Sequence, residues 1–305
     1  MTSHNSGAKR RLVDLVKRSS HNRVAWLAYD TCGRLGEYLS SIHRWAANAR
    51  KDRAIQELAR RLFPTLTVET GPFAGMRYIA ESAGSTMLPK LLGSYESELH
   101  DTWRELMRHG YSVVVDIGSA EGYYAVGFAR AFPEAHVYAY DTDSRARELC
   151  AQMAELNGVA DRVHVGGFCT AETLRSLPLG DCALIISDCE AYERTLFTRD
   201  LAQYLSRHDL VIETHDFIDM EISSELRSVF TGTHKIESVK SVDDIQKVHS
   251  YNHKKLVGLS IQERYRIVRE SRGGIMEWLV LVSETAAAPT SRAANSSAVL
   301  RSELR

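Results

Sequence analysis

The chain of 305 residues is 44% hydrophobic and 25% charged, the composition of a globular protein with room for one large domain and a smaller one. Its 38 basic and 39 acidic residues leave a formal net charge of -1, so no global field favours nucleic acid or an anionic membrane. The five cysteines form no CxxC pair, which argues against a zinc knuckle or a disulfide framework. With a polar N-terminus and only short apolar runs, the sequence predicts a cytoplasmic protein that acts on a small molecule.

Apolar residues recur at helical spacing over the first part of the chain. The pattern includes Leu12, Leu15, Val16, Ile55, Leu58, Ala59 and Leu62. It predicts a helical N-terminal region over residues 1–65. Such helices can pack on the neighbouring domain, form a homodimer with a second copy of the chain, or cover a substrate, and the sequence leaves these roles open.

Residues 66–110 are expected to lead into the main domain. Two short runs at 66–70 and 76–80 flank a Gly-Pro turn, which is typical of a small hairpin. The following segment, 99–108, has helical spacing, and Gly110 marks its end.

After Gly110, short apolar runs alternate with amphipathic segments. Strands are expected at 112–117, 136–140, 162–165, 183–187, 209–213 and 275–282, and helices at 123–132, 144–157, 190–204 and 223–230. This alternation predicts an α/β fold: a Rossmann-like, doubly wound, mostly parallel sheet over 111–284, with the N-terminal helical addition. Residues 249–255 read as a solvated connection, and 285–305 as a disordered tail.

The first strand-to-helix turn of this domain is the expected cofactor loop, because ligands of open parallel sheets lie at the carboxyl ends of the strands. Gly118 and Gly122 allow close approach of the backbone, and the following helix offers free N–H groups. The loop from Asp116 has the spacing D-x-G-x-x-x-G, and Ala120 replaces the middle glycine of the dinucleotide fingerprint. NAD or FAD is therefore disfavoured.

Asp141 ends the second expected strand, about 25 residues after Asp116, close to the offset at which an acid binds both ribose hydroxyls. This placement favours a ribose-bearing cofactor without a pyrophosphate. The alternative is that Asp141 only caps the next helix, a role that Thr142, Asp143 or Ser144 can also fill.

These segments resemble those of class I S-adenosylmethionine-dependent methyltransferases. The run VVDIGSAEGYY at 114–124 is similar to their first motif, and YAYD at 138–141 to their second. The glycine-tyrosine pair in Gly122-Tyr123-Tyr124 and the run ISDCEAYE at 186–193 resemble the FkbM-type group. The resemblance covers about 112–213 and a last strand near 278–281. Glu121 departs from it where the group has an uncharged residue, and Ala191 where it has glycine.

The resemblance implies methyl transfer from S-adenosylmethionine, with S-adenosylhomocysteine as product, to a hydroxyl of a small molecule such as a sugar or a secondary metabolite. Carried over by position, it implies cofactor contacts for Asp116, Gly118, Ser119, Glu121, Gly122, Asp141, Thr142, Gly167, Phe168 and Asp188. Methylation of nitrogen or carbon stays open, as does a non-catalytic protein of this fold whose N-terminal helices bind a partner.

Acids and a histidine follow the fourth and fifth expected strands. His215 is the expected general base because imidazole titrates near neutrality, and Asp188 and Glu190 complete the expected catalytic set. Alternatively, His215 is a polar loop residue and Glu190 complements a helix dipole. Asp188, Glu213, His215 and Asp216 can also assemble a divalent-metal site, but no metal-specific spacing is present, so no metal is expected.

Overall fold

The computed structural model describes residues 16, 17, 19 and 22–284. The helical positions Leu12 and Leu15 and the tail expected at 285–305 lie outside these residues. The chain divides into two compact units, Met1–Leu58 and Ala59–Arg305, each of which is described by itself.

The first unit contains most of helix α2 (Arg23–Leu62), a continuous helix of 40 residues, which agrees with the helical pattern of the N-terminal sequence. Several of its large apolar side chains are exposed, namely Val24, Trp26, Leu27, Tyr38 and Leu39. Across the described ranges, no helix combines the length and the apolar character needed to cross a membrane.

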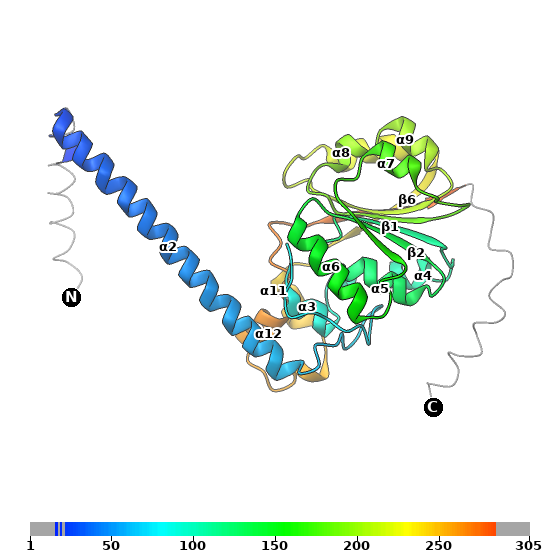
Figure 1. The fold of residues 1–305 in the computed structure, drawn as a ribbon, viewed down its shortest axis with the longest axis horizontal. Helices are drawn as coiled ribbons and strands as arrows, with labels where there is room; N and C mark the ends of the chain where they lie inside the picture. The colour runs from blue at the N-terminus through cyan, green and yellow to red at the C-terminus, as the bar shows by residue number, and fades with distance from the viewer. Residues whose placement is uncertain (1–15, 18, 20–21, 285–305) are drawn as a thin grey trace. The chain divides into compact units, whose positions relative to one another are not determined.

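The second unit is built on a seven-stranded sheet in the order β3-β2-β1-β4-β5-β7-β6 (Figure 1). The strands are β1 (Val113–Ile117), β2 (His136–Tyr140), β3 (Val163–Gly166), β4 (Leu184–Ser187), β5 (Asp209–Thr214), β6 (His234–Lys240) and β7 (Glu277–Ser283). Strands β1 to β5 pair in parallel and β7 runs antiparallel, so the mostly parallel Rossmann-like sheet is confirmed. The strand order reverses between β1 and β4, and in open α/β sheets the ligand crevice lies beyond the carboxyl ends of the strands at such a reversal.

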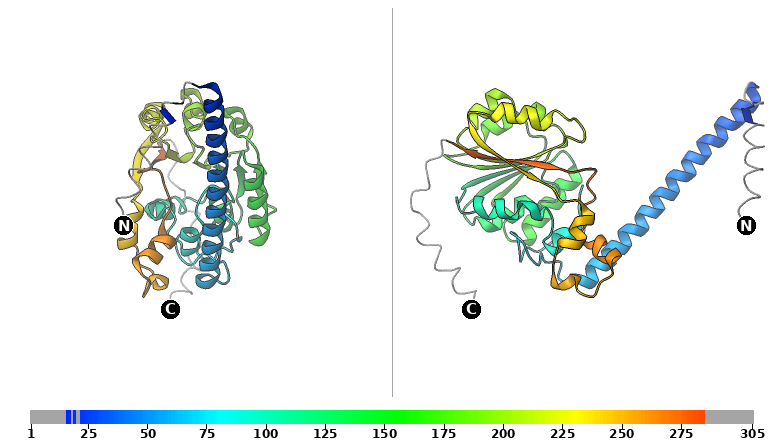
Figure 2. Two further views of the ribbon diagram at one scale, coloured as in Figure 1. Left: turned by 90° about the vertical axis from the view of Figure 1, so that its left-hand side faces the viewer. Right: turned by 180° about the vertical axis from the view of Figure 1, so that it is seen from behind.

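Helices cover both faces of this sheet. The helices of this unit after α2 are α3 (Met87–Leu92), α4 (His100–Leu106), α5 (Tyr123–Ala131), α6 (Ser144–Leu156), α7 (Ala171–Ser176), α8 (Glu193–Leu196), α9 (Arg199–Tyr204), α10 (Ile222–Phe230), α11 (Asp244–Ser250) and α12 (Ile261–Val268), with 3-10 turns η1 (Ser97–Leu99) and η2 (Lys254–Leu256). Helices α4, α5 and α6 lie on one face and α7, α8 and α9 on the other, as the view from behind also shows (Figure 2).

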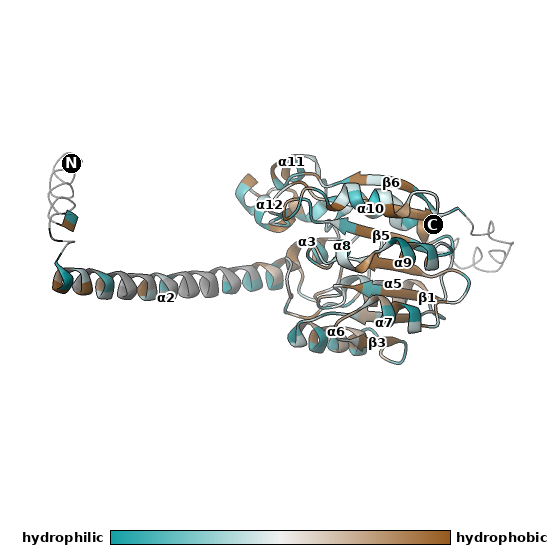
Figure 3. Cartoon of the chain, turned by 90° about the horizontal axis from the view of Figure 1, so that it is seen from above, coloured by the Kyte–Doolittle hydropathy of each residue, from teal (hydrophilic) through white to brown (hydrophobic). Residues whose placement is uncertain are grey.

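Alternation along the strands explains this layering. In β1, Val113, Val115 and Ile117 point to one face, where they join a buried cluster with Leu201 of α9 and Ile222 of α10. Hydrophobic residues concentrate in the central strands, whereas α6 is largely hydrophilic on its outer side (Figure 3). The core therefore holds the strand ends rigidly at the crevice.

Four local features differ from the sequence expectations, and two of them lie within the sheet domain's run of strands and helices. Strand β6 was not predicted, because polar residues such as Lys235, Glu237 and Lys240 face solvent at this sheet edge and hide the strand pattern. The single helix expected at 190–204 is two helices, since Thr198 caps α9 by accepting a hydrogen bond from Leu201 N at 3.3 Å.

The other two differences lie beside the sheet. The hairpin expected at 66–80 forms one isolated antiparallel bridge, between Thr67 and Arg77, in place of two strands. The connection expected at 249–255 is not merely solvated chain: it contains the end of α11 and the turn η2, and the neighbouring Lys247 is buried.

Candidate active site

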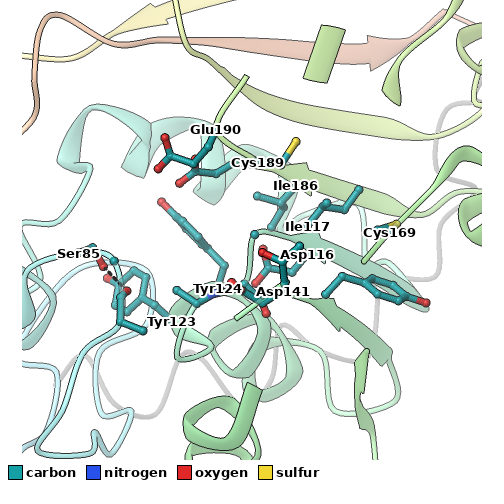
Figure 4. Close-up of a pocket in the computed structure, with 18 of the residues that line it drawn as sticks. Ser85, Asp116, Ile117, Tyr123, Tyr124, Asp141, Cys169, Ile186, Cys189 and Glu190 are labelled. Atoms are coloured by element: carbon teal, nitrogen blue, oxygen red, sulfur yellow. Dashed lines mark hydrogen bonds between the residues drawn. The ribbon is translucent and has the colours of Figure 1, made fainter. Parts of the chain in front are cut away.

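A cleft of about 250 Å³ opens at the carboxyl ends of β1 to β4 (Figure 4). Nine of the expected site residues line it: Asp116, Gly118, Ser119, Asp141, Thr142, Gly167, Phe168, Asp188 and Glu190. The expected residues Glu121, Gly122 and His215 are not part of the lining. The sequence therefore located the cleft, but three of its candidate residues lie outside the lining.

The glycine loop after β1 is closely packed against the end of β4. Gly118 has φ +86°, and a Cβ at this position would lie 1.6 Å from the carbonyl oxygen of Asp188. Gly118 N and Ser119 N donate to the carbonyl of Tyr140 at 2.8 and 3.0 Å, which ties the ends of β1 and β2 together. Gly122 begins α5 with φ +90°, and a Cβ there would lie 2.8 Å from the sulfur of Cys150, so this glycine serves packing on α6.

Asp141 connects the two loops of the cleft. Its Oδ2 accepts a hydrogen bond from Ala120 N at 2.8 Å, and its Oδ1 accepts one from Asp143 N at 2.8 Å. The helix cap is a different residue, because Asp143 accepts from Arg145 N at the start of α6. Each oxygen of Asp141 keeps acceptor capacity for a ligand.

Three buried polar atoms in the cleft have no hydrogen-bond partner among the described residues: Oδ2 of Asp116, Oγ of Ser119 and the hydroxyl of Tyr123. All three residues line the cleft, and they are only 2%, 4% and 3% exposed. Burial raises the pKa of Asp116 to about 7, and the charges of Asp188 and Asp141 raise it further. Unpaired buried polar groups are costly, so this arrangement is typical of a binding site whose ligand supplies the partners.

His215 follows β5 and lies behind Asp188. Its Nε2 is 3.3 Å from Oδ1 of Asp188 and 3.7 Å from Oε2 of Glu190, and its Nδ1 is 3.1 Å from Oε1 of Glu193. Glu193 is fully buried and also accepts a hydrogen bond from Cys189 N at 2.8 Å.

These carboxylates change the titration of His215. Burial alone lowers the pKa of His215, but the contacts with Asp188 and Glu193 and their charges outweigh burial and raise it to about 10. His215 is therefore an imidazolium at neutral pH in the free protein, which differs from the near-neutral titration expected from the sequence.

The four residues that the sequence offered as an alternative metal site do not come together as one set. Glu213 pairs with Arg272 Nη1 at 2.5 Å, and Asp216 accepts a hydrogen bond from Ser223 N at 2.9 Å. A different trio, Asp188, Glu190 and His215, offers ligand atoms that lie within 4.8 Å of one another. A divalent cation would have to displace the proton on the imidazole, because a histidine ligand must be neutral.

A buried ionic network supports the acceptor side from segments far apart in the sequence. Arg272 Nη2 contacts Oε1 of Glu96 at 2.5 Å, and its Nε contacts Oε2 of Glu270 at 2.9 Å. The Arg272 link to Glu213 attaches this network to the end of β5. Burial raises the pKa of Glu213, and neighbouring carboxylates including Asp188 add to the rise. No strand end or motif in the sequence pointed to Glu96 or Arg272.

The wall opposite the strand ends comes from residues before the sheet. Ala83, Gly84, Ser85, Lys90 and Tyr95 line the cleft there, and sequence reasoning identified none of them. They follow no strand of the predicted sheet and belong to the glycine loop of no predicted cofactor motif, so only the folded chain shows their place.

Glu121 explains how this wall is held. Its carboxylate points away from the cleft and accepts hydrogen bonds from Ser82 Oγ at 2.7 Å and Ala83 N at 3.0 Å, and it also binds Tyr78 and Lys90. The carboxylate of Glu121, in the glycine loop, thus holds the wall segment that contains Ala83 and Lys90.

No protein family profile matches the chain, and no curated protein matches it. Solved structures with a similar fold include the cofactor-bound Rv0187 from MTB, at 15% identity and TM-score 0.40, covering 64% of this chain and 83% of that one. Another is an O-methyltransferase from Bacillus cereus in complex with SAH, at 14% identity and TM-score 0.40, covering 58% and 77%. The Bacillus subtilis tRNA methyltransferase TrmK is similar at 15% identity and TM-score 0.38, covering 60% and 64%.

Proposed function

We propose that the cleft binds S-adenosylmethionine and that this protein is an FkbM-type methyltransferase that methylates a hydroxyl group of a small molecule. The observation that carries the proposal is that one cleft contains both the unpartnered buried Oδ2 of Asp116 and the carboxylate of Asp141, which follows the neighbouring strand. A ligand with a cationic group and a ribose, but no pyrophosphate, satisfies both acids.

The cleft residues fit the parts of this cofactor. Asp116 would accept from the ammonium of its methionine part, and Asp141 would accept from the ribose hydroxyls. Gly167 leaves open space after β3, and Phe168 lies beside the ring of Tyr192 with a centroid distance of 4.8 Å, so this end suits a planar base. When bound, the cofactor supplies a methyl group on a positively charged sulfur.

The residues at the ends of β4 and β5 would position the acceptor and take its proton. Asp188 lines the cleft and would accept the hydrogen bond of the acceptor hydroxyl. Nε2 of His215, directly behind Asp188, would then receive the proton in the fraction of molecules whose imidazole is neutral. Glu193 holds Nδ1 on the other side of the ring and keeps the imidazole in place. Glu190, at the mouth, is exposed and would contact the acceptor.

The charges around the cleft favour an acceptor without phosphates. Asp188 and Glu190 stand at the acceptor side, where they would repel the backbone of a nucleic acid. The proposal therefore includes a small-molecule acceptor in the cytoplasm. It also includes a homodimer through α2, whose exposed apolar side chains a second copy would cover.

The proposal is tested with methyl-labelled S-adenosylmethionine and a panel of sugars, phenols, amines and tRNA. We expect label on a hydroxylated acceptor and a loss of about 100-fold or more in rate in His215→Gln, as for loss of a general base. Label on tRNA or on an amine contradicts the proposed acceptor. Cofactor binding with no transfer to any class favours the non-catalytic alternative.

A further inference from the structure

Lys90 contributes a positive charge to an acidic cleft. Among the described side chains that line the cleft, it is the only basic one. The acids of the lining, Asp116, Asp141, Asp188 and Glu190, all lie on strand ends or in the loops after them. A ligand group with negative charge would therefore find attraction only at the wall that carries Lys90.

The ammonium of Lys90 is held in a defined place. Its Nζ lies 2.6 Å from Oε1 of Glu121 and 2.6 Å from Oγ of Ser85. It also lies 4.9 Å from the ring centre of Tyr95 and 5.5 Å from that of Tyr123. An ammonium has three N–H donors, so two are engaged by these oxygens and one is left on the side of the aromatic rings.

The negative charge of Glu121 is not directed at the Lys90 ammonium alone. Its carboxylate also accepts hydrogen bonds from Ser82 Oγ, Ala83 N and the hydroxyl of Tyr78, so its negative charge is shared among several donors. These contacts fix the cleft segment around Ser85 together with Lys90. Figure 4 shows Ser85 and Tyr123 on one side of the cleft and Asp116 and Asp141 on another. Tyr123, whose ring centre lies 5.5 Å from Nζ of Lys90, carries one of the buried hydroxyls of the lining that have no partner among the described residues.

We propose that Lys90, with Ser85 and the hydroxyl of Tyr123, forms the subsite for the α-carboxylate of the cofactor's methionine part. This inference rests on the proposed function. Asp116 would then bind the ammonium of the amino acid at the sheet. Lys90 would bind its carboxylate at the opposite wall, which is the segment from Ser85 to Lys90. Glu121 is a positioning residue that holds Lys90 through a direct ion pair.

The test compares two ligands by calorimetry: S-adenosylhomocysteine and 5′-methylthioadenosine, which lacks the amino acid part. In Lys90→Met, affinity for S-adenosylhomocysteine should fall by about tenfold or more, as for loss of a charge-assisted contact, while affinity for methylthioadenosine stays within about twofold. Lys247→Met is the matched control, because Lys247 is equally buried and paired with Glu98 and Glu270, outside the cleft lining. In Lys247→Met, the ratio of the affinities for S-adenosylhomocysteine and methylthioadenosine should equal the ratio in the wild type.

The result is overturned if Lys90→Met weakens both ligands equally or neither of them. Because this variant leaves Glu121 buried without its cation, Lys90→Met/Glu121→Gln and Ser85→Ala are measured beside it, with melting curves as the check on folding. Ser85→Ala keeps the ion pair and should still lower the affinity for S-adenosylhomocysteine about threefold relative to methylthioadenosine. If the wild type binds neither ligand, the proposed function itself fails, which is a different outcome from an unchanged ratio.

Discussion

The two sides of the cleft are built differently. On the cofactor side, Asp116, Gly118 and Asp141 come from two adjacent strands, and buried polar atoms are left open for a ligand. On the acceptor side, His215 and Glu213 are already enclosed by ionic partners, which include Arg272 from a distant segment. The cofactor side is therefore shaped by the backbone of the sheet, whereas the acceptor side is set by coupled charges.

The largest effect that this comparison predicts is at Gly118. Gly118→Ala places a Cβ against the carbonyl of Asp188 at a positive φ, so we expect a loss of about 3 kcal/mol or more in unfolding free energy and no measurable cofactor binding. Denaturant unfolding and calorimetry measure both. Gly167→Ala is the control, since nothing lies within 4 Å of its Cβ position, and its stability should change by less than about 0.5 kcal/mol. Equal stability of the two variants would contradict the close approach of β1 and β4.

The charge coupling on the acceptor side is tested by the titration of His215. Its folded pKa of about 10 lies above the ordinary value of 6.5, so its contribution to stability is complete below pH 6.5 and lost as pH rises towards 10. The unfolding free energy should fall by up to about 1.4 kcal/mol per pH unit in that window. Glu193→Gln should bring the titration to lower pH and flatten this slope.

NMR titration of the imidazole, with His215→Gln for assignment, measures the pKa directly. Glu190→Gln serves as the control, because Glu190 is exposed and 3.7 Å from Nε2, and it should move the pKa less than Glu193→Gln does. A wild-type pKa near the ordinary value would show that the two carboxylates do not control this residue.

A smaller effect is expected for the ribose contact. Asp141→Ala should weaken cofactor binding by about 1 to 3 kcal/mol through loss of charge-assisted hydrogen bonds. Calorimetry with S-adenosylhomocysteine measures it, and Asp143→Ala, which removes the cap of α6, is the control for disturbance of the same loop. Unchanged affinity in a folded Asp141→Ala protein would remove Asp141 from the site.

The smallest effect concerns the loop after β4. Ala191 has φ +74°, a left-handed conformation that glycine adopts without the steric cost of a Cβ. Ala191→Gly should therefore raise the unfolding free energy by about 0.5 kcal/mol, the difference between relieved strain and the greater flexibility of glycine in the unfolded chain. Denaturant melts measure it, and a clear loss of stability would show that the Ala191 methyl packs favourably.

The sequence predicted the residues near the strand ends better than those from segments outside the parallel strands. Strand 136–140 was predicted to the residue, because its buried Val137 and Ala139 alternate with less buried residues and this pattern reflects the core. Asp141 and Asp188 were found because each directly follows a predicted strand, and Asp116 because it lies near the end of one. Lys90 lies before the sheet, and its partner Glu121 was expected to face the cofactor instead. Contacts between segments so far apart depend on tertiary packing, which leaves no periodic trace in the sequence.

The central claim is that the cleft takes S-adenosylmethionine and not a dinucleotide. Calorimetric titration of the purified protein with S-adenosylhomocysteine and with NAD tests it most directly. We predict one S-adenosylhomocysteine bound per chain, no heat of binding with NAD, and loss of the S-adenosylhomocysteine signal in Gly118→Ala. Binding of NAD alone would contradict the account.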